Sequence, residues 1–320
     1  MSFVERVDRF QRQHPHAGLP IAVVYKLVDD QGTYLAALIT YYGFVSIVPL
    51  LLLSSTILGF VLHADPHLQQ EVLNSAVGQF PVVGTQLAHD HGINGSGAGL
   101  VIGILGTLYG GLGAAQAAQN AMNTIWRVPR NRRPNPLTGR LRSILLLAVV
   151  GLSVLGTTGL AALGSVIDVV GPGTKVLLGL LGLVVNTAVF TLGFRVATAR
   201  DLTIRETVPG AVGAAIAWQG LQYVGAWYVG STVAKATEIN AVFALILGLV
   251  AWLYLESVVV VLAVEYNSVR SLGLYPRALL TPFTDDVDLT HADERTYAQQ
   301  AKAQRAKGFE RISVDFEQGD

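Results

Sequence analysis

The sequence predicts an all-α, polytopic membrane protein with six transmembrane helices and both ends in the cytoplasm. Three observations lead to this fold class. Only 14% of the 320 residues are charged, whereas an average soluble domain has about 25%. The apolar residues gather in six long runs, and the lysines and arginines gather between alternate runs. The chain has no cysteine, which excludes disulfides, thiol catalysis and cysteine metal sites.

Each of the six apolar runs can supply the roughly 20 helical residues that cross the hydrocarbon core of a bilayer. Helices are predicted because lipid offers no hydrogen-bond partner to an open backbone. The predicted spans are Leu35–Leu62, Gly97–Met122, Ser143–Ile167, Lys175–Ala197, Val208–Val229 and Ile239–Val269.

The basic residues predict the orientation of these spans. The two terminal segments and the second and fourth connections hold 20 of the 22 lysines and arginines. Only Lys175 and Lys235 fall on the opposite side. Under the positive-inside rule this distribution places both ends in the cytoplasm of a bacterial cell and the chain in its inner membrane. It also supports six spans, because a missed helix would scramble the alternation.

We divide the chain into a cytoplasmic N-terminal segment (1–34), a six-helix transmembrane domain (35–270) and a cytoplasmic C-terminal tail (271–320). The tail is polar, and we expect it to be mobile, with one helix near Ala292–Lys307. The first external connection is expected to hold short amphipathic or re-entrant helices near Leu68–Leu87.

The first residues of the chain predict a short amphipathic helix. Its apolar face carries Phe3, Val4, Val7 and Phe10, and its arginines lie elsewhere. Such a helix either lies on the cytoplasmic leaflet or packs on its own protein, and both interpretations stay open.

Four segments carry a family resemblance, and they are LAALITYYGFVSIVPLLLL (Leu35–Leu53), AMNTIWRVPRNRRPNPLTGRLRS (Ala121–Ser143), VPGAVGAAIAWQGLQYVGAWYVG (Val208–Gly230) and LGLVAWLYLESVVVVLAVEYNSV (Leu247–Val269). Together they resemble the YihY/BrkB family of bacterial inner-membrane proteins, from about Tyr34 to Arg270. The resemblance implies a helical membrane body. The family's names point to serum resistance, an old ribonuclease BN-like label and the movement of lipids or other solutes. Glu256 departs from the family pattern, which more often has a small or hydroxyl residue there.

Polar residues inside the predicted spans are candidates for a substrate pathway, because polar groups are costly in lipid. The alternative is that they form structural hydrogen bonds between helices. The candidates are Tyr42, Ser46, Pro49, Gln116, Gln119, Asn120, Asn123, Gln219, Gln222, Glu256 and Glu265. Glu256 gives the most specific hypothesis, since a carboxylate near mid-depth of the membrane could carry a proton. We expect its side chain to face a polar cavity.

Two further groups of residues suggest ligands at the membrane surface. The arginines after the second predicted span could bind anionic lipid head groups or serve only as a topology signal; they are Arg127, Arg130, Arg132, Arg133, Arg140 and Arg142. The histidines of the first external connection have spacings that zinc accepts, although solvated loop histidines are far commoner; they are His63, His67, His89 and His91. We expect no cofactor.

The function predicted from these features is a transporter or flippase-like protein for a lipid or amphiphilic solute. The alternative is a membrane scaffold or envelope-organising protein without a substrate. An enzyme is not expected, since GxSxG, HExxH and Walker A motifs are absent from the sequence. The arginine loop lacks the acids and histidines of a nuclease, so neither ribonuclease activity nor a nucleic-acid partner is expected. The ladder Gly106, Gly110, Ala114 and Ala118 predicts close helix packing within the chain in preference to a homo-oligomer face.

Overall fold

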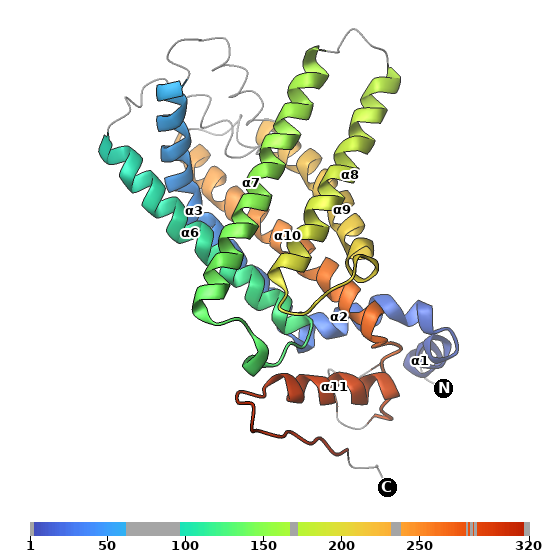
Figure 1. The fold of residues 1–320 in the computed structure, drawn as a ribbon. Helices are drawn as coiled ribbons and strands as arrows, with labels where there is room; N and C mark the ends of the chain where they lie inside the picture. Colours follow the sequence, from blue (N-terminus) through green and yellow to red (C-terminus); the bar gives the residue numbers. More distant parts are fainter. Residues whose placement is uncertain are drawn as a thin grey trace.

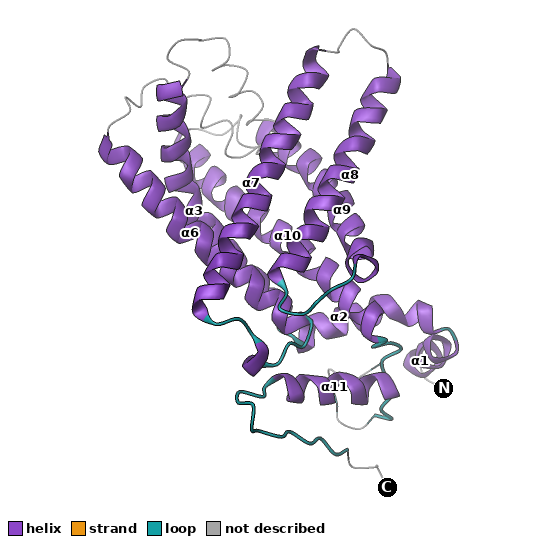
Figure 2. Cartoon of the chain, viewed as in Figure 1, coloured by secondary structure: helices purple, strands orange, loops and turns teal. Residues whose placement is uncertain are grey.

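The computed structural model describes residues 3–61, 97–166, 172–231, 238–279, 281, 284 and 287–316, and this part of the chain is helical without strands (Figure 2). Its long helices have 26 to 35 residues each and are α3 (Gly32–Val61), α6 (Gly97–Ile125), α7 (Pro136–Val166), α8 (Pro172–Ala197), α9 (Ile204–Ser231) and α10 (Glu238–Leu272). Each predicted span coincides with one of these helices. The largest difference is at α7, which begins seven residues earlier than predicted.

Three of the long helices contain described stretches that are long and apolar enough to cross a membrane, namely Pro136–Ser153, Val176–Ala197 and Ile246–Leu272. A shorter apolar stretch, Gly32–Ile47, lies in α3. Six spans and their orientation therefore stay predictions. The helices expected in the first external connection lie outside the described residues.

Helices α3 and α6 lie side by side along their length (Figure 1). The glycines of α6 permit this approach: a Cβ atom on Gly106 would lie 2.6 Å from the ring of Pro49, and one on Gly110 would lie 2.6 Å from the Cα atom of Ser46. A Cβ atom on Gly113 would likewise clash with the ring of Tyr42. At these positions the small residues pack helices of one chain together, which confirms the predicted role of the glycine ladder.

Short helices gather at one end of the long ones, where both termini also lie (Figure 1). They are α1 (Phe3–Gln13), α2 (Leu19–Asp29) and α11 (His291–Ala303), and we call this layer the base. Helix α11 is the predicted C-terminal helix. It begins at His291, directly after the N-cap residue Thr290, whose hydroxyl accepts the backbone N–H of Asp293 while the Asp293 carboxylate accepts the N–H of Thr290.

The two terminal segments are bonded to each other in the base. Gln11 of α1 is buried and donates to the carbonyl of Arg277, and Asp8 accepts the N–H of Leu279. Phe10 on the apolar face of α1 is 55% exposed. Helix α1 therefore packs on the protein through polar side chains and turns Phe10 outward. The C-terminal segment, expected as a mobile tail, is held against α1 and α2 through Arg277, Asp288 and Gln300.

Candidate functional site

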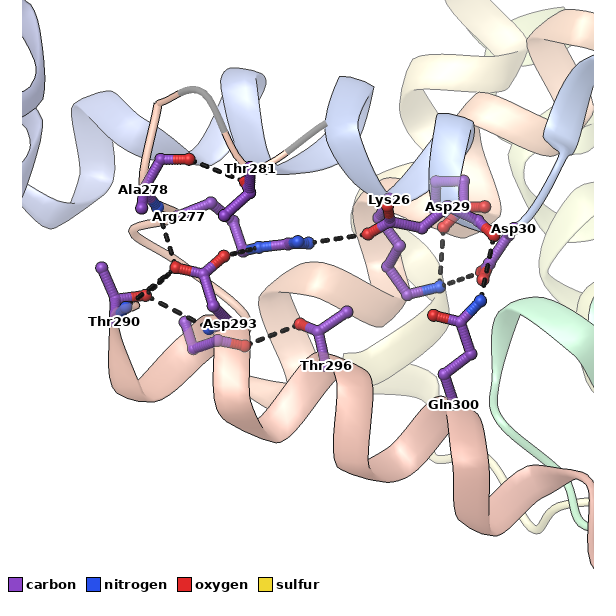
Figure 3. Close-up of polar contacts among 12 residues, drawn as sticks. Lys26, Asp29, Asp30, Arg277, Ala278, Thr281, Thr290, Asp293, Thr296 and Gln300 are labelled. Carbon is purple, nitrogen blue, oxygen red and sulfur yellow. Dashed lines mark hydrogen bonds and ion pairs between the residues drawn. The ribbon is translucent and has the colours of Figure 1, made fainter. Parts of the chain in front are cut away.

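Four charged side chains meet where α2, α6 and α10 converge above the base. The Lys26 ammonium lies 2.6 Å from Asp30 and 2.8 Å from Glu265, and Arg127 lies 2.5 Å from the other oxygen of Asp30. Lys26 also donates to the carbonyl of Ile125 at the end of α6. The side chains are fully buried, except for Arg127 at 6% exposure. We call these four residues the buried charge cluster; Figure 3 shows the Lys26–Asp30 side of it.

The buried charge cluster is balanced, with two cations and two anions. Removing a charge from water costs several kcal/mol, and only close opposite charges and hydrogen bonds offset that cost. Here Lys26 satisfies three acceptors on three different elements: Asp30 beyond α2, Glu265 on α10 and the end of α6. This geometry holds the three elements together at one end of the helix bundle.

A second ionic group joins α11 to α2 within the base. Arg277, fully buried, pairs with Asp29 at 3.0 Å and with Asp293, and Gln300 donates to the Asp29 carbonyl (Figure 3). Burial lowers the pKa of Arg277, but the hydrogen bond to Asp293 and the two negative charges raise it more, so its pKa lies above its ordinary value. The ring of Tyr297 lies 5.3 Å from the guanidinium carbon.

Two asparagines brace the polar ends of the long helices. On α10, Asn267 accepts the N–H of Gly210 at 2.7 Å and donates to the Thr207 carbonyl at 2.9 Å, which bridges α9 beside Pro209. On α6, Asn123 accepts the N–H of Ala199 at 2.7 Å, beyond the end of α8. Both asparagines are buried, and each forms hydrogen bonds with backbone groups that would be costly to bury without a partner.

Residues 23–278 of the sequence match the family model described as virulence factor BrkB. The chain belongs to the BrkB family. It is 27% identical over 261 residues to a UPF0761 membrane protein of Alkalilimnicola ehrlichii, an alignment that covers 78% of this chain and 57% of that protein. The chain thus spans little more than half the length of this relative. No solved structure matches the chain. The resemblance to the YihY/BrkB family is confirmed, and with it a membrane protein.

In this BrkB-family protein the polar stripe of α6 bonds to neighbouring segments. Gln119 donates to Ser143 of α7 at 2.8 Å, and Asn120 accepts from Arg133 at 2.9 Å. Asn123 is the brace described above, and Gln116 is exposed. For Gln119, Asn120 and Asn123 the structural alternative, hydrogen bonds between segments, describes the contacts that are present.

The candidates on α3 and Glu265 on α10 have structural contacts as well. Tyr42, Ser46 and Pro49 face the glycines of α6, and Ser46 donates to the Gly43 carbonyl. Glu265 belongs to the buried charge cluster. It is therefore separate from Glu256, which lies nine residues earlier on the same helix.

Three candidates of the BrkB-family protein keep unpaired polar atoms, and one of them is Glu265, whose second oxygen has no hydrogen-bond partner among the described residues. One side-chain oxygen of Gln222 on α9 and one of Glu256 on α10 are buried without a hydrogen-bond partner among the described residues. The other contact of Glu256 is a hydrogen bond from the Trp252 side chain. Gln219 makes a long hydrogen bond, 3.4 Å, to the Gly179 carbonyl of α8. Gln222 and Glu256 are the residues of the predicted set that keep an unpaired buried oxygen and have no charged partner among the described residues.

The six arginines proposed for lipid head groups separate into two sets. Arg127 points inward to Asp30, so its assignment to lipid is wrong: an occupied, buried guanidinium is not available to a head group. Arg133 bonds Asn120, and Arg142 donates to the Thr198 carbonyl at 3.0 Å. The exposed members are Arg130, Arg132 and Arg140.

The four histidines of the proposed external metal site lie outside the described residues. Within the described ranges no group of His, Cys, Asp or Glu could hold a metal ion. The reading of the sequence missed Lys26, Asp29, Asp30, Arg277 and Asp293 as a connected set. One signal was present: Lys26 and Asp30 stand one helical turn apart just before the first apolar run, where unpaired charges would be costly.

Proposed function

We propose that this BrkB-family protein moves a lipid or amphiphilic solute across the bacterial inner membrane, with six spans and both ends in the cytoplasm. The observation that supports this proposal is the pair of unpaired, buried oxygens on Gln222 and Glu256. A buried polar atom without a partner costs about 1–3 kcal/mol, so such atoms inside an apolar helix pair call for a function.

A contrast along α10 adds support. At one end of the helix, Glu265 is ion-paired with Lys26 and Asn267 is bonded to α9, whereas Glu256, nine residues earlier, has no charged partner among the described residues. A transporter needs one closed end and polar groups that a solute can reach. No nucleotide-binding motif is present in the sequence, so movement would be passive or driven by an ion gradient.

The second candidate function is a scaffold that organises the envelope without a substrate. The tightly bonded base favours it, because α1, α2 and α11 form a fixed surface beside the exposed arginines Arg130, Arg132 and Arg140. Under both proposals the protein is not an enzyme and needs no cofactor.

Reconstitution into liposomes with fluorescent phospholipids separates the two functions. A transporter moves labelled lipid between leaflets faster than empty liposomes do, and the rate depends on pH if Glu256 titrates. Glu256→Gln retains volume and hydrogen bonding but cannot titrate, so it should remove the pH dependence while the protein elutes and melts like the wild type. Glu294→Gln, an exposed change on α11, is the matched control. Movement no faster than in empty liposomes, tested with phospholipids and other amphiphiles, favours the scaffold.

A further inference from the structure

A groove runs between α9 and α10 on the outer surface of the bundle. It has a volume of about 300 Å³ and is lined by Pro209, Gly213 and Ala217 of α9 and by Val259, Leu262 and Tyr266 of α10, among others. On each helix the lining residues recur every three or four positions, so they form one stripe on each helix face. Eight residues separate Pro209 from Ala217, which gives the groove a length of about 12 Å at 1.5 Å per residue.

Two arginines continue the stripes beyond one end of the groove. Arg205 stands one turn before Pro209 on α9, and Arg270 stands one turn after Tyr266 on α10. Both are exposed, and Arg270 donates to the carbonyl of Arg205 at 3.3 Å, so the two helix ends lie together. Neither guanidinium pairs with a carboxylate among the described residues. The neighbouring acid, Glu206, is occupied by Thr203 and Arg200.

Pro209 explains why Arg270 sits there. Proline has no N–H, so in α9 the carbonyl of Arg205, four residues earlier, loses its usual helical donor. Arg270 supplies a replacement hydrogen bond to that carbonyl. The same proline lines the groove, so one residue both shapes the apolar wall and fixes a positive charge at its end.

We propose that the groove binds one acyl chain of an anionic phospholipid, whose phosphate lies against Arg205 and Arg270. The apolar lining suits a hydrocarbon chain, and the open side of the groove suits entry from the bilayer. The arginine forks match phosphate oxygens, and Tyr266, one turn from Arg270, is an aromatic residue of the kind that is enriched where membranes meet water. The groove can hold a resident lipid whether or not the protein transports one.

Photocrosslinking in lipid nanodiscs tests this site. The protein is placed in phosphatidylcholine nanodiscs containing a small share of phosphatidylglycerol with a diazirine on its acyl chain, and labelled peptides are identified by mass spectrometry. Peptides that contain Pro209–Ala217 and Val259–Tyr266 should be labelled above the peptides of α8. The latter carry exposed leucines such as Leu177 and Leu180 and report ordinary surrounding lipid.

Two variants and two controls sharpen the result. Gly213→Leu fills the groove and should reduce its labelling to the α8 level, whereas Gly151→Leu, an exposed position of α7 that also faces open space, should not. Arg205→Gln with Arg270→Gln should weaken phosphatidylglycerol labelling about tenfold, to the level of a diazirine phosphatidylcholine. The exposed pair Arg132→Gln with Arg140→Gln controls for general loss of charge. Labelling equal to that of α8, or unchanged by Gly213→Leu or by the Arg205 and Arg270 changes, overturns the proposal.

Discussion

The ammonium of Lys26 lies 2.8 Å from the carboxylate of Glu265, a residue 239 positions later, and both side chains are fully buried. This contact joins the N-terminal segment to the last long helix. Removing one partner leaves an uncompensated buried charge, which costs about 3–5 kcal/mol.

Lys26→Met and Glu265→Gln should therefore each lower the stability of the protein strongly. The double variant removes one charge of each sign and leaves Asp30 paired with Arg127. Its loss in free energy of unfolding should therefore be smaller than the sum of the two single losses by about 1–3 kcal/mol. Denaturation in detergent of the wild type and the three variants gives the coupling energy. Strict additivity would show that the two residues act independently.

Gly210→Ala should destabilise the contact between α9 and α10. A Cβ atom there would lie 2.6 Å from the amide nitrogen of Asn267 and still closer to the Ala263 carbonyl, so the helices must separate or lose the asparagine brace. We expect a loss of about 1–3 kcal/mol or more. The control is Gly220→Ala, where the space is open and alanine's helix propensity should add up to about 1 kcal/mol. Equal thermal unfolding of the two variants would contradict the packing argument.

Asp293→Asn should release α11 from the rest of the base. The change removes the negative charge on which buried Arg277 depends, together with an acceptor at the start of the helix. Trypsin should then cleave after Lys302 and Arg305 about tenfold faster than in the wild type, because local opening exposes these sites. The control is Glu294→Gln in the same turn, whose only recorded partner is the exposed His291. A wild-type cleavage rate for Asp293→Asn would mean that α11 is held by other contacts.

Stability should depend on pH through Glu206 at the start of α9. Burial raises the pKa of Glu206, but hydrogen bonds from Thr203 and the charge of Arg200 lower it more, so the net pKa lies below its ordinary value. A carboxylate with a depressed folded-state pKa stabilises the fold above its unfolded-state pKa of about 4.3, and this contribution disappears as the pH falls through the folded-state value.

The measurement is the melting temperature in detergent between pH 7 and pH 3 for the wild type and Glu206→Gln. The glutamine keeps an acceptor for Thr203 but has no charge to lose. The difference between the two proteins should be constant above about pH 5 and should shrink below it. A difference that stays constant to pH 3 would remove Glu206 as the cause.

The orientation predicts the outcome of reporter fusions. Fusions after Gly92 and Lys235 should report the external side, and fusions after Asn135, Asp201 and Asp320 should report the cytoplasm, because the basic connections stay inside. A cytoplasmic signal at Gly92 would reverse the orientation and the assignment of the base to the cytoplasm.

Much of the helical framework was predictable because it depends on local patterns. Apolar runs longer than 20 residues predict long helices wherever they occur, and each of the six predicted runs lies in one. The glycine ladder of α6 predicted close packing, since small residues permit it regardless of the partner. Family membership was also readable from the order of short segments, and the match over residues 23–278 confirms it.

The roles of individual polar residues depended on tertiary structure. In the sequence, Asn123, Gln119 and Glu256 are all polar residues in or beside predicted spans, and all are equal candidates for a substrate pathway. In the structure, the two amides are bonded to other segments, whereas Glu256 keeps an oxygen without a hydrogen-bond partner. Likewise, Arg127 and Arg130 stand three residues apart in one basic loop, but only Arg127 turns inward to Asp30.

By itself the sequence determined where the long helices form and that they belong in a membrane, because hydrophobic length and helix propensity act along the chain. Only the tertiary structure decided which charges are paired, since the partners of Lys26 and Arg277 lie up to 239 and 248 residues away. It also decided that the two polar termini build a shared base. A buried charge must find its counter-charge in space, and no local pattern names a partner that distant.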